Sequence, residues 1–237
     1  MNLAPPMWER SIQPELLDHL PPQDPRAIRS RRDLRRINAW MGNARHAGAC
    51  LQAAARRAAP RRIVDLGAGD GFFLLRCLRR LPSLPKGMEV VLVDRRDATD
   101  AGLLAELRAR AFVPRVEQAD AAEWLRAMPA EPGTWVVANL FLHHFSTESL
   151  SALFGVVAEK AELCCACEPR RNWWSLAASR MLGLIGANAV TRQDAVVSVR
   201  AGFQGGELSA LWPATGAWQT CERRAGLFSH LFLAQRV

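Results

Sequence analysis

From residue 60 onward the chain alternates between strand-like and helix-like segments, and this alternation is the strongest constraint on its fold. The strand-like segments are short apolar runs, and the segments between them carry apolar residues at helical spacing. The predicted strands are residues 61–67, 88–94, 112–118, 134–140 and 162–168, and the predicted helices are residues 71–81, 97–112, 120–128 and 146–163. This order predicts an α/β fold with a mainly parallel sheet that is covered by helices on both faces.

Details of these segments add further predictions. Pro114 is expected to break the third strand near its start, and Ser146 or Thr147 is expected to cap the helix that follows the fourth strand. Residues 218–237 have the pattern of two strands joined by a turn at Ala225-Gly226. We expect this hairpin to close the edge of the sheet in the antiparallel sense.

The two remaining regions lack good strands and are predicted to be helical. Residues 1–59 form a predicted helical N-terminal cap, and residues 60–237 form the main domain with a helical insert at about 170–213. Within the cap, Asp24 and Pro25 have the pattern of a helix start. Ile28, Leu34, Ile37 and Met41 then recur at roughly helical spacing, which predicts the packed face of that helix.

Composition predicts a soluble cytoplasmic protein without a membrane span. The sequence is 49% hydrophobic and 23% charged, its start has no apolar stretch of the kind found in secretory signals, and its uncharged runs are too short to cross a bilayer. The formal charge of +8 comes mostly from arginine, with the densest cluster at residues 26–40. A solvated helix face is the favoured interpretation of this cluster, and a patch for an anionic substrate, a carrier protein or nucleic acid is the alternative.

The six cysteines do not form a metal-binding pattern. Cys164, Cys165 and Cys167 lie in a short apolar segment that is predicted to be a buried strand, and the other three are isolated in the sequence. No C-x-x-C pair is joined by a second pair or by histidines at zinc-site spacing. We therefore predict reduced thiols and no metal.

The sequence "DLGAGDG" at residues 65–71 places three glycines between the first predicted strand and the first predicted helix. This is the end of a parallel sheet where open α/β folds bind ligands, and bare backbone allows a ligand to approach closely. A dinucleotide fingerprint needs glycines at relative positions one, three and six, which are Gly67, Gly69 and Phe72 here. Because the third glycine is missing, the pattern does not favour a nicotinamide dehydrogenase.

The pattern D-x-G-x-G-x-G instead resembles the first motif of class I S-adenosylmethionine-dependent methyltransferases. Further motifs of that family follow in order, and the resemblance covers roughly residues 60–170. It implies a Rossmann-like fold and S-adenosylmethionine as cofactor, with an acid at the end of the second strand on the ribose hydroxyls and an adenine-binding turn after the third strand. The cofactor-site residues that it implies are Asp65, Gly67, Gly69, Gly71, Asp94, Asp120, Ala121 and Asn139.

The segment after the fourth predicted strand indicates which class of molecule accepts the methyl group. Amino-methylating enzymes of nucleic acids carry an Asn/Asp-Pro-Pro-aromatic loop there, but this chain has Asn139 followed by Leu140 and Phe141, and it has no Pro-Cys nucleophile for cytosine C5 chemistry. The sequence "LFLHHFSTES" is similar to the loop of phenolic and quinone-type small-molecule methyltransferases. That similarity implies a histidine beside the substrate hydroxyl, so His143 is the predicted catalytic base, with His144 as the reserve.

The predicted function is therefore O-methylation of a small aromatic acceptor of the phenolic, quinol or polyketide type, with nucleic acid disfavoured. Three alternatives remain: C-methylation of a similar molecule, an RNA or protein methyltransferase that uses the basic cap, and a catalytically silent binding protein. The apolar segment 172–190 is expected either to wall a hydrophobic acceptor pocket or to be a core helix. The sequence leaves the oligomeric state open.

Overall fold

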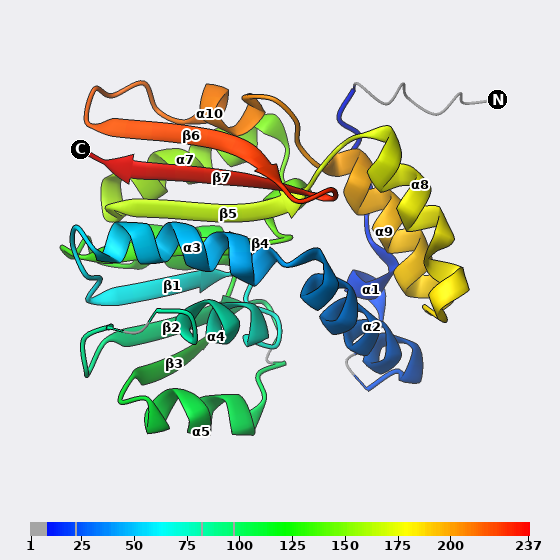
Figure 1. Ribbon diagram of the computed structural model, residues 1–237, viewed down its shortest axis with the longest axis horizontal. Coiled ribbons are helices and arrows are strands. Elements are labelled where there is room, and N and C mark those ends of the chain that lie inside the picture. The colour runs from blue at the N-terminus through cyan, green and yellow to red at the C-terminus, as the bar shows by residue number, and fades with distance from the viewer. Residues whose placement is uncertain (1–8, 22, 82, 97) are drawn as a thin grey trace.

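The computed structural model describes residues 9–237 except 22, 82 and 97, and its centre is a seven-stranded sheet (Figure 1). The strands are β1 (Arg62–Leu66), β2 (Glu89–Asp94), β3 (Val113–Gln118), β4 (Thr134–Asn139), β5 (Leu163–Pro169), β6 (Trp218–Ala225) and β7 (Ser229–Arg236). Their order is β3-β2-β1-β4-β5-β7-β6, and β7 runs antiparallel to both of its neighbours while the first five strands are parallel. The predicted sheet and its antiparallel hairpin are confirmed.

The strand order places a crevice at one end of the sheet. From β1 the chain first builds outward through β2 and β3 and then returns to the other side of β1 with β4 and β5. The point between β1 and β4, where the strand order reverses, is the topological switch point of the sheet. The connections after these two strands leave toward opposite faces of the sheet, so the carboxyl ends of β1 and β4 border an open crevice.

Helices cover both faces of the sheet and its carboxyl end. They are α1 (Leu16–His19), α2 (Pro25–Met41), α3 (Asn43–Ala55), α4 (Phe72–Leu78), α5 (Ala101–Ala109), α6 (Ala121–Ala127), α7 (Thr147–Lys160), α8 (Trp173–Met181), α9 (Ala189–Ala201) and α10 (Glu207–Leu211), with 3-10 turns η1 (Leu142–His144) and η2 (Leu182–Ile185). Alternate residues of each strand enter opposite cores: Ile63 packs with α3, α4 and α5, and Val64 packs with α6, α7 and α10.

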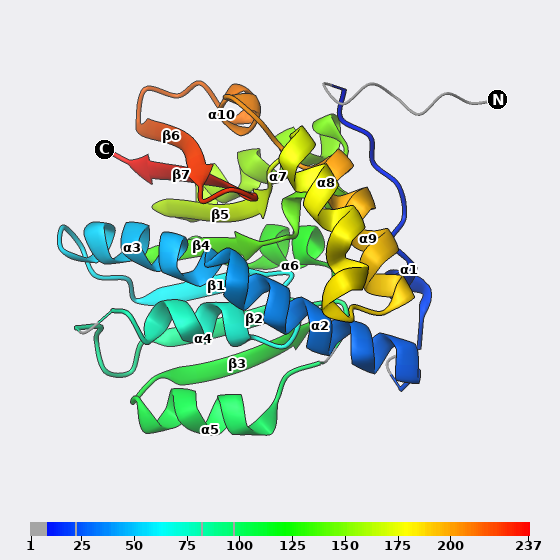
Figure 2. The same ribbon diagram turned by 45° about the vertical axis from the view of Figure 1, so that its right-hand side comes forward.

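The N-terminal helices and the insert meet at the carboxyl end of the parallel strands (Figure 2). There α2 packs on α9, where Ser30 shares a hydrogen bond with Thr191 at 2.9 Å and Asp33 accepts one from the Asn188 amide at 2.9 Å. Two helices within the predicted cap and insert lie elsewhere, since α3 packs on α4, β5 and β7 and α10 packs on α7 and β6. The division at residues 59 and 60 stays a prediction.

Pro114 does not break the third strand, so that prediction is wrong. β3 begins at Val113, and Pro114 is the register partner of Val90. The strand is at the edge of the sheet and pairs only with β2. An edge strand forms ladder hydrogen bonds on one side alone, and it therefore tolerates a residue without an N–H.

The predicted packed face of α2 is wrong at Ile28, whereas Leu34, Ile37 and Met41 are half-buried, and the predicted start of the helix is confirmed. The Asp24 side chain caps the helix by accepting a hydrogen bond from the Arg26 amide, but Ile28 is 46% exposed. The buried residues are Ala27, Ser30 and Asp33, which face α9. Polar partners on α9 make this small and polar face the better fit, which a purely apolar periodicity cannot detect.

The cysteine segment is buried as predicted. Cys164, Cys165 and Cys167 lie in β5, all six cysteines are free, and burial raises the pKa of Cys164 to about 12. Ser146 is the cap of α7 and accepts a hydrogen bond from the Ser149 amide. Among the described residues, no helix combines the length and the apolar character that crossing a membrane would require.

Candidate functional site

A cavity of about 270 Å³ opens at the carboxyl ends of β1, β2 and β4. Its walls come from the loops after these strands, from α2 and α3, and from the N-terminal segment 9–21. The sequence-predicted residues that line it are Asp65, Gly67, Gly69, Asp94, Asn139 and His143. Four others do not line it: Gly71, Asp120, Ala121 and His144. The structure thus brings together predicted residues from three separate strand ends.

The glycine loop needs its glycines for two different reasons. All three have positive φ angles, +67° at Gly67, +55° at Gly69 and +75° at Gly71, and residues other than glycine rarely adopt such angles. A Cβ at Gly67 would lie 2.2 Å from the Phe141 ring, whereas a Cβ at Gly69 would have no neighbour within 4 Å. Gly67 is therefore required by packing, and Gly69 offers open backbone to the cavity.

Asp94 joins the two loops that border the cavity. Its Oδ2 accepts a hydrogen bond from the Gly69 amide at 2.9 Å, and its Oδ1 accepts one from the Arg96 amide at 2.9 Å. Each carboxylate oxygen can accept further hydrogen bonds. The carboxylate consequently fixes the glycine loop and still has acceptor capacity toward a ligand.

Asp65 is a buried carboxyl group at the base of the cavity. It is 1% exposed, and its Oδ2 has no hydrogen-bond partner among the described residues. Burial, followed by the charges of Asp94 and Asp70, raises the pKa of Asp65 well above its usual range. An unpaired buried carboxylate is costly, so this position favours a positively charged or hydrogen-bond-donating ligand group.

Asp120 and Ala121 begin α6 beside the cavity. Asp120 caps that helix through the amides of Ala122 and Glu123, and its Oδ2 lies 2.6 Å from the Arg95 guanidinium. Ala121 is buried in the core beneath α6. Both residues therefore have a structural role, Asp120 as a helix cap and Ala121 in the core, and their contact with a cofactor stays a prediction.

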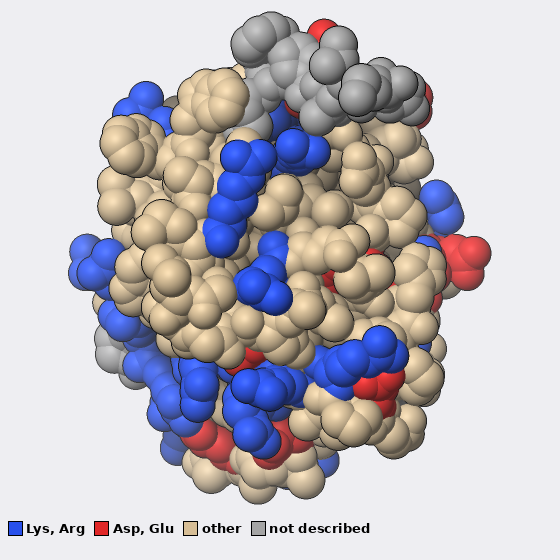
Figure 3. Space-filling model, turned by 90° about the vertical axis from the view of Figure 1, so that its right-hand side faces the viewer, with Lys and Arg blue, Asp and Glu red and all other residues tan. Residues whose placement is uncertain are grey.

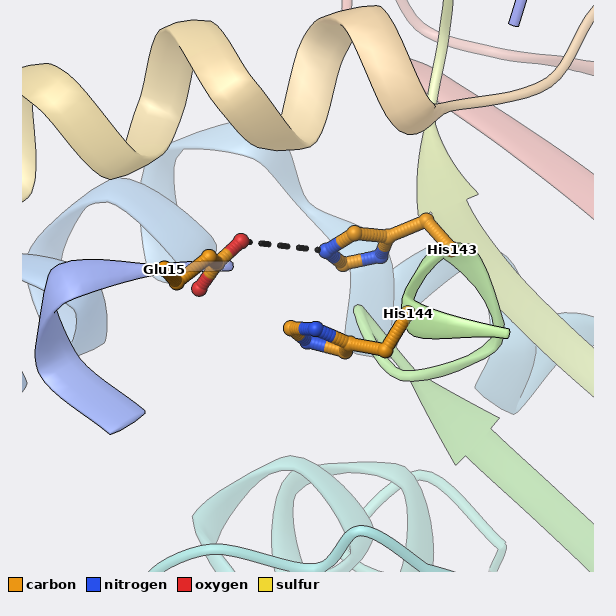
Figure 4. Close-up of side chains that lie close together, drawn as sticks. All are labelled: Glu15, His143 and His144. Carbon is orange, nitrogen blue, oxygen red and sulfur yellow. Dashed lines mark hydrogen bonds and ion pairs between the residues drawn. The ribbon is translucent and has the colours of Figure 1, made fainter. Parts of the chain in front are cut away.

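His143 is buried between two carboxylates. Its Nδ1 lies 2.7 Å from Glu168 Oε2, and its Nε2 lies 3.3 Å from Glu15 Oε1. Figure 4 shows Glu15 approaching the histidine pair from the N-terminal segment. Glu168 at the end of β5 also accepts hydrogen bonds from the amides of Phe141 and Leu142, at 3.0 and 2.9 Å. Glu168 thereby fixes both the loop after β4 and the orientation of the imidazole.

The two carboxylates keep His143 protonated. Burial disfavours the charged imidazole, but hydrogen bonds to Glu15 and Glu168 and their charges outweigh it and raise the pKa of His143 to about 9. Although burial acts against its charged form, the hydrogen bond to His143 lowers the pKa of Glu15. In this arrangement both ring nitrogens of His143 are donors, and the imidazole has no free lone pair to accept a proton.

His144 has the opposite electrostatic character. Loss of solvent around its ring, followed by the charge of His143, lowers its pKa. The neutral imidazole has a free lone pair, but His144 is not among the residues that line the cavity. Ligand atoms of Glu15, His143 and His144 all lie within 4.8 Å of one another, so this cluster has the spacing of three metal ligands, and His143 would have to lose a proton to be one of them. The absence of a metal stays a prediction.

The N-terminal segment 9–21 is held in place from several elements. Arg10 donates to the carbonyls of Ala201 and His143 at 2.7 and 3.0 Å. The Asp194 carboxylate accepts from the amides of Leu16 and Leu17 at 2.8 and 3.0 Å. These contacts, together with hydrogen bonds from Arg96 to backbone carbonyls of the segment, position Glu15 in the wall of the cavity.

Sequence reasoning missed Glu15, Glu168 and Asp194. Glu168 carried a usable signal, because it is a carboxylate at the carboxyl end of a buried strand next to the predicted ligand-binding edge. Glu15 and Asp194 carried none, since their role depends on the way in which helices α1 and α9 dock.

The arginine cluster of α2 is only in part a solvated face. Arg31 and Arg35 line the cavity, and Arg35 forms an ion pair with Asp70 and stacks over the Phe72 ring at 4.7 Å. Arg29 and Arg32 are exposed. The solvated face that the sequence predicted therefore includes Arg29, Arg32 and the half-exposed Arg35, and Arg31 and Arg35 in addition border the cavity.

An apolar cleft extends from the cavity between α2, α8 and α9. It shares Leu34, Asn38, Leu140 and Ser198 with the cavity. The other lining residues are Ile37, Trp40, Met41, Pro169, Ser175, Ala178, Ser179, Leu182, Ala195, Val199 and Phe228, and none of them is charged. Leu140 has a strained φ of +53° where the two spaces meet, as is common at ligand-binding sites.

Five large apolar residues of segment 172–190 neither wall this cleft nor enter the core, so both predictions for the segment fail for them, whereas Leu176 is in the core and Leu182 lines the cleft. Trp173 and Trp174 are 67% and 80% exposed, and Leu184 and Ile185 are 79% and 71% exposed. The inward face of α8 instead has the small residues Ser175, Ala178 and Ser179 along the cleft.

Comparisons with known proteins give structural matches only. No protein-family model matches the sequence, and no curated protein matches it. The plantazolicin methyltransferase BamL, solved with a triazolic desmethylPZN analog and SAH, aligns with a TM-score of 0.62 at 10% identity over 93% of this chain and 92% of its own. The magnesium protoporphyrin IX methyltransferase of Synechocystis PCC 6803, solved with SAM, aligns with a TM-score of 0.52 at 15% identity over 88% and 84%.

A third match is a candidate O-methyltransferase from Nostoc punctiforme PCC 73102, with a TM-score of 0.55 at 13% identity over 81% of this chain. This chain spans 56% of that protein. Identities this low establish the fold and no more. The chain has the fold of the S-adenosylmethionine-dependent methyltransferases.

Proposed function

We propose that the protein is an S-adenosylmethionine-dependent methyltransferase of a small apolar acceptor. The observation that carries the proposal is the convergence of Asp65, Gly69, Asp94 and Asn139 on one cavity at the switch point of this fold. The bound SAH and SAM of the structural neighbours support the same cofactor.

The cavity residues fit this cofactor. The unpaired Asp65 carboxyl group would receive the ammonium of the methionine moiety, directly or through a neighbouring group, because that cation removes the cost of a buried unpaired charge. Asp94 would accept hydrogen bonds from the ribose hydroxyls with its remaining acceptor capacity. When bound, the cofactor supplies an activated methyl group on a sulfonium, and the protein needs only to align the acceptor and manage its proton.

We place the acceptor in the apolar cleft, with its reactive group toward Glu15 and His143. The uncharged lining favours an aromatic or aliphatic body, which supports a phenolic or quinol-type acceptor. A phenol must lose a proton near transfer, and its pKa is near 10. Glu15 is an ionised carboxylate in the cavity wall, the protonated His143 orients it, and it can accept the phenol proton as methyl transfer to the oxygen makes that proton strongly acidic. We therefore assign proton acceptance to the Glu15–His143 pair, with Glu15 as the group that faces the acceptor.

Calorimetric titration tests the cofactor assignment. Wild-type protein is expected to bind S-adenosylmethionine and S-adenosylhomocysteine without added metal and to show no binding of NADH. Asp65→Asn serves as a site variant of nearly equal size that cannot become negatively charged, and its affinity for both ligands should fall. Preferred binding of NADH by the wild type would overturn the assignment.

The acceptor class is tested by labelling pools of phenols, quinols and RNA with radiolabelled cofactor. Reversal of the exposed Arg29 and Arg32 to glutamate should leave methylation of a phenol nearly unchanged, because these side chains do not line the cavity. Salt-dependent RNA binding by the wild type that this reversal abolishes would favour an RNA methyltransferase instead.

A further inference from the structure

We propose that the outer face of α8 and η2 docks on an anionic phospholipid membrane surface. This face, called the apolar face below, consists of Trp173, Trp174, Met181, Leu184 and Ile185. Their exposed fractions are 67%, 80%, 57%, 79% and 71%. Five large apolar side chains exposed within thirteen consecutive residues form the kind of contiguous surface that marks an interaction site.

The segment exposes more large apolar side chains than it buries. Residues 173, 174, 181, 184 and 185 recur at helical spacing on the solvent side, while the side toward the protein buries Leu176 and Leu182 together with Ser175 and Ser179. The Ser175 hydroxyl has no hydrogen-bond partner among the described residues. Both tryptophans of α8 thus face the solvent while two serines are buried beneath them, and this arrangement favours an apolar environment outside the protein.

The charges around the apolar face are almost all positive. Between residues 170 and 206 the arginines that reach the surface are Arg170, Arg180, Arg192 and Arg200, whereas Arg171 is buried and paired with Glu207. The one acid in this range is Asp194. Asp194 is 4% exposed and accepts two backbone hydrogen bonds, so it does not neutralise the surface. Arg36 of α2 lies with Ile185 in the wall of a neighbouring groove, and Arg192 contacts the backbone at Gly183.

Figure 3 shows this side of the molecule, where uncharged residues form a broad area interrupted by arginine or lysine side chains, and further basic side chains gather below it with acidic side chains among them. Tryptophans beside arginines suit the interface of an anionic bilayer, because the indole rings insert at headgroup depth and guanidinium groups pair with phosphates. A second copy of this chain fits less well, since it would place like charges opposite each other. The charge pattern therefore selects a negatively charged lipid surface.

The apolar face adjoins the acceptor cleft. Ile37 and Trp40 line the cleft, and the same two residues line the neighbouring groove with Ile185 of the apolar face. Docking of this face would bring the cleft close to the lipid. If the proposed function holds, its acceptor would be a lipid-soluble aromatic compound that enters from the membrane.

Vesicle co-sedimentation tests the proposal with the full-length protein. Wild type is expected to sediment with vesicles of phosphatidylcholine and phosphatidylglycerol, and much less with phosphatidylcholine alone. The double variant Trp174→Glu, Ile185→Glu should lower the partition coefficient at least tenfold, and Arg180→Glu should weaken binding to the anionic vesicles alone. Val113→Glu is the matched control, because Val113 is an exposed apolar residue, 50% exposed, on the edge strand β3.

Thermal unfolding confirms that each variant is folded, and cofactor titration in the same samples separates the two proposals. Loss of vesicle binding in the double variant with cofactor binding retained supports the membrane surface. Equal vesicle binding by wild type and double variant, or no binding by the wild type, overturns it. A wild-type dimer that dissociates in the double variant, without vesicle binding, assigns the face to self-association instead. Absence of cofactor binding with vesicle binding intact contradicts the proposed function alone.

Discussion

The two sides of the cavity are built in different ways. On the cofactor side, Gly67, Gly69 and Asp94 each lie within a few residues of a strand end, and backbone contacts fix them. On the acceptor side, Glu15 and His143 are 128 residues apart in sequence and meet only because helices α1, α2 and α9 dock over the sheet. The first side depends on backbone conformation and the second on buried side-chain charges.

Because of this difference, the two sides should respond to different changes, the first to added steric bulk and the second to altered charge. A backbone-built site tolerates little steric change, and on this side of the cavity Asp65 is the buried carboxyl group with a raised pKa. A site built from buried ion pairs depends on the protonation state of each member and on the packing that brings them together. The predictions below separate the two sides by these properties.

The largest expected effect is Gly67→Ala on the cofactor side. The new Cβ would meet the Phe141 ring at 2.2 Å in a left-handed backbone conformation. Left-handed strain and overpacking together cost about 2–5 kcal/mol. We expect loss of cofactor binding and a lower free energy of unfolding in urea titration. Gly69→Ala is the matched control, because it has the same kind of φ without a neighbour within 4 Å, and its unfolding free energy should fall less.

On the acceptor side, His143→Ala is expected to lower turnover at least a hundredfold, about 2.7 kcal/mol, while the affinity for S-adenosylhomocysteine hardly changes. Glu15→Gln should give a loss of similar size, because the amide cannot accept a proton. Steady-state kinetics and calorimetry measure the two quantities. A loss of turnover in His144→Ala alone would assign the base to His144. Unchanged turnover in His143→Ala, Glu15→Gln and His144→Ala would mean that the protein contributes only by aligning the acceptor with the cofactor.

The charge of His143 gives the acceptor side a pH dependence of stability. Its pKa is raised to about 9, above the value near 6.5 of an unfolded chain. The stabilisation is therefore fully present below pH 6.5 and is lost as pH rises through about 9, and it amounts to on the order of 3 kcal/mol. Urea unfolding of wild type between pH 6 and 10 should show this loss, and His143→Gln should lack it. Parallel curves for the two proteins would contradict the buried ion pair.

The smallest expected effect is Asp94→Ala. Loss of hydrogen bonds to a charged group costs about 1.5–3 kcal/mol, which lowers cofactor affinity roughly 10-fold to 150-fold. Asp94→Asn should fall between wild type and alanine, because one oxygen still accepts from the Gly69 amide. Affinity of the protein for the acceptor alone should not change, and a change in both affinities would show that the two sides are coupled through the glycine loop.

The sequence determined the sheet and the cofactor side of the cavity. Strand alternation, the glycine spacing and the acids at strand ends are local patterns, and the topology of parallel strands brings their carboxyl ends together without further information. The hairpin at Gly226 follows in the same way from a turn residue between two strand-like runs, with φ of +71° at the glycine.

Only the tertiary structure decided the acceptor side and the outer surface. Glu15 and Asp194 have no distinctive local pattern, and burial together with docking gives each of them its partner. Helical periodicity identified apolar and polar positions on α2 and the insert but not which face turns inward. Small residues of α8 pack against α9, so its tryptophans face outward, and the partly exposed Arg35 pairs with Asp70. The physical reason is that a side chain's energy depends on its neighbours, and long-range packing, which sequence spacing does not encode, chooses those neighbours.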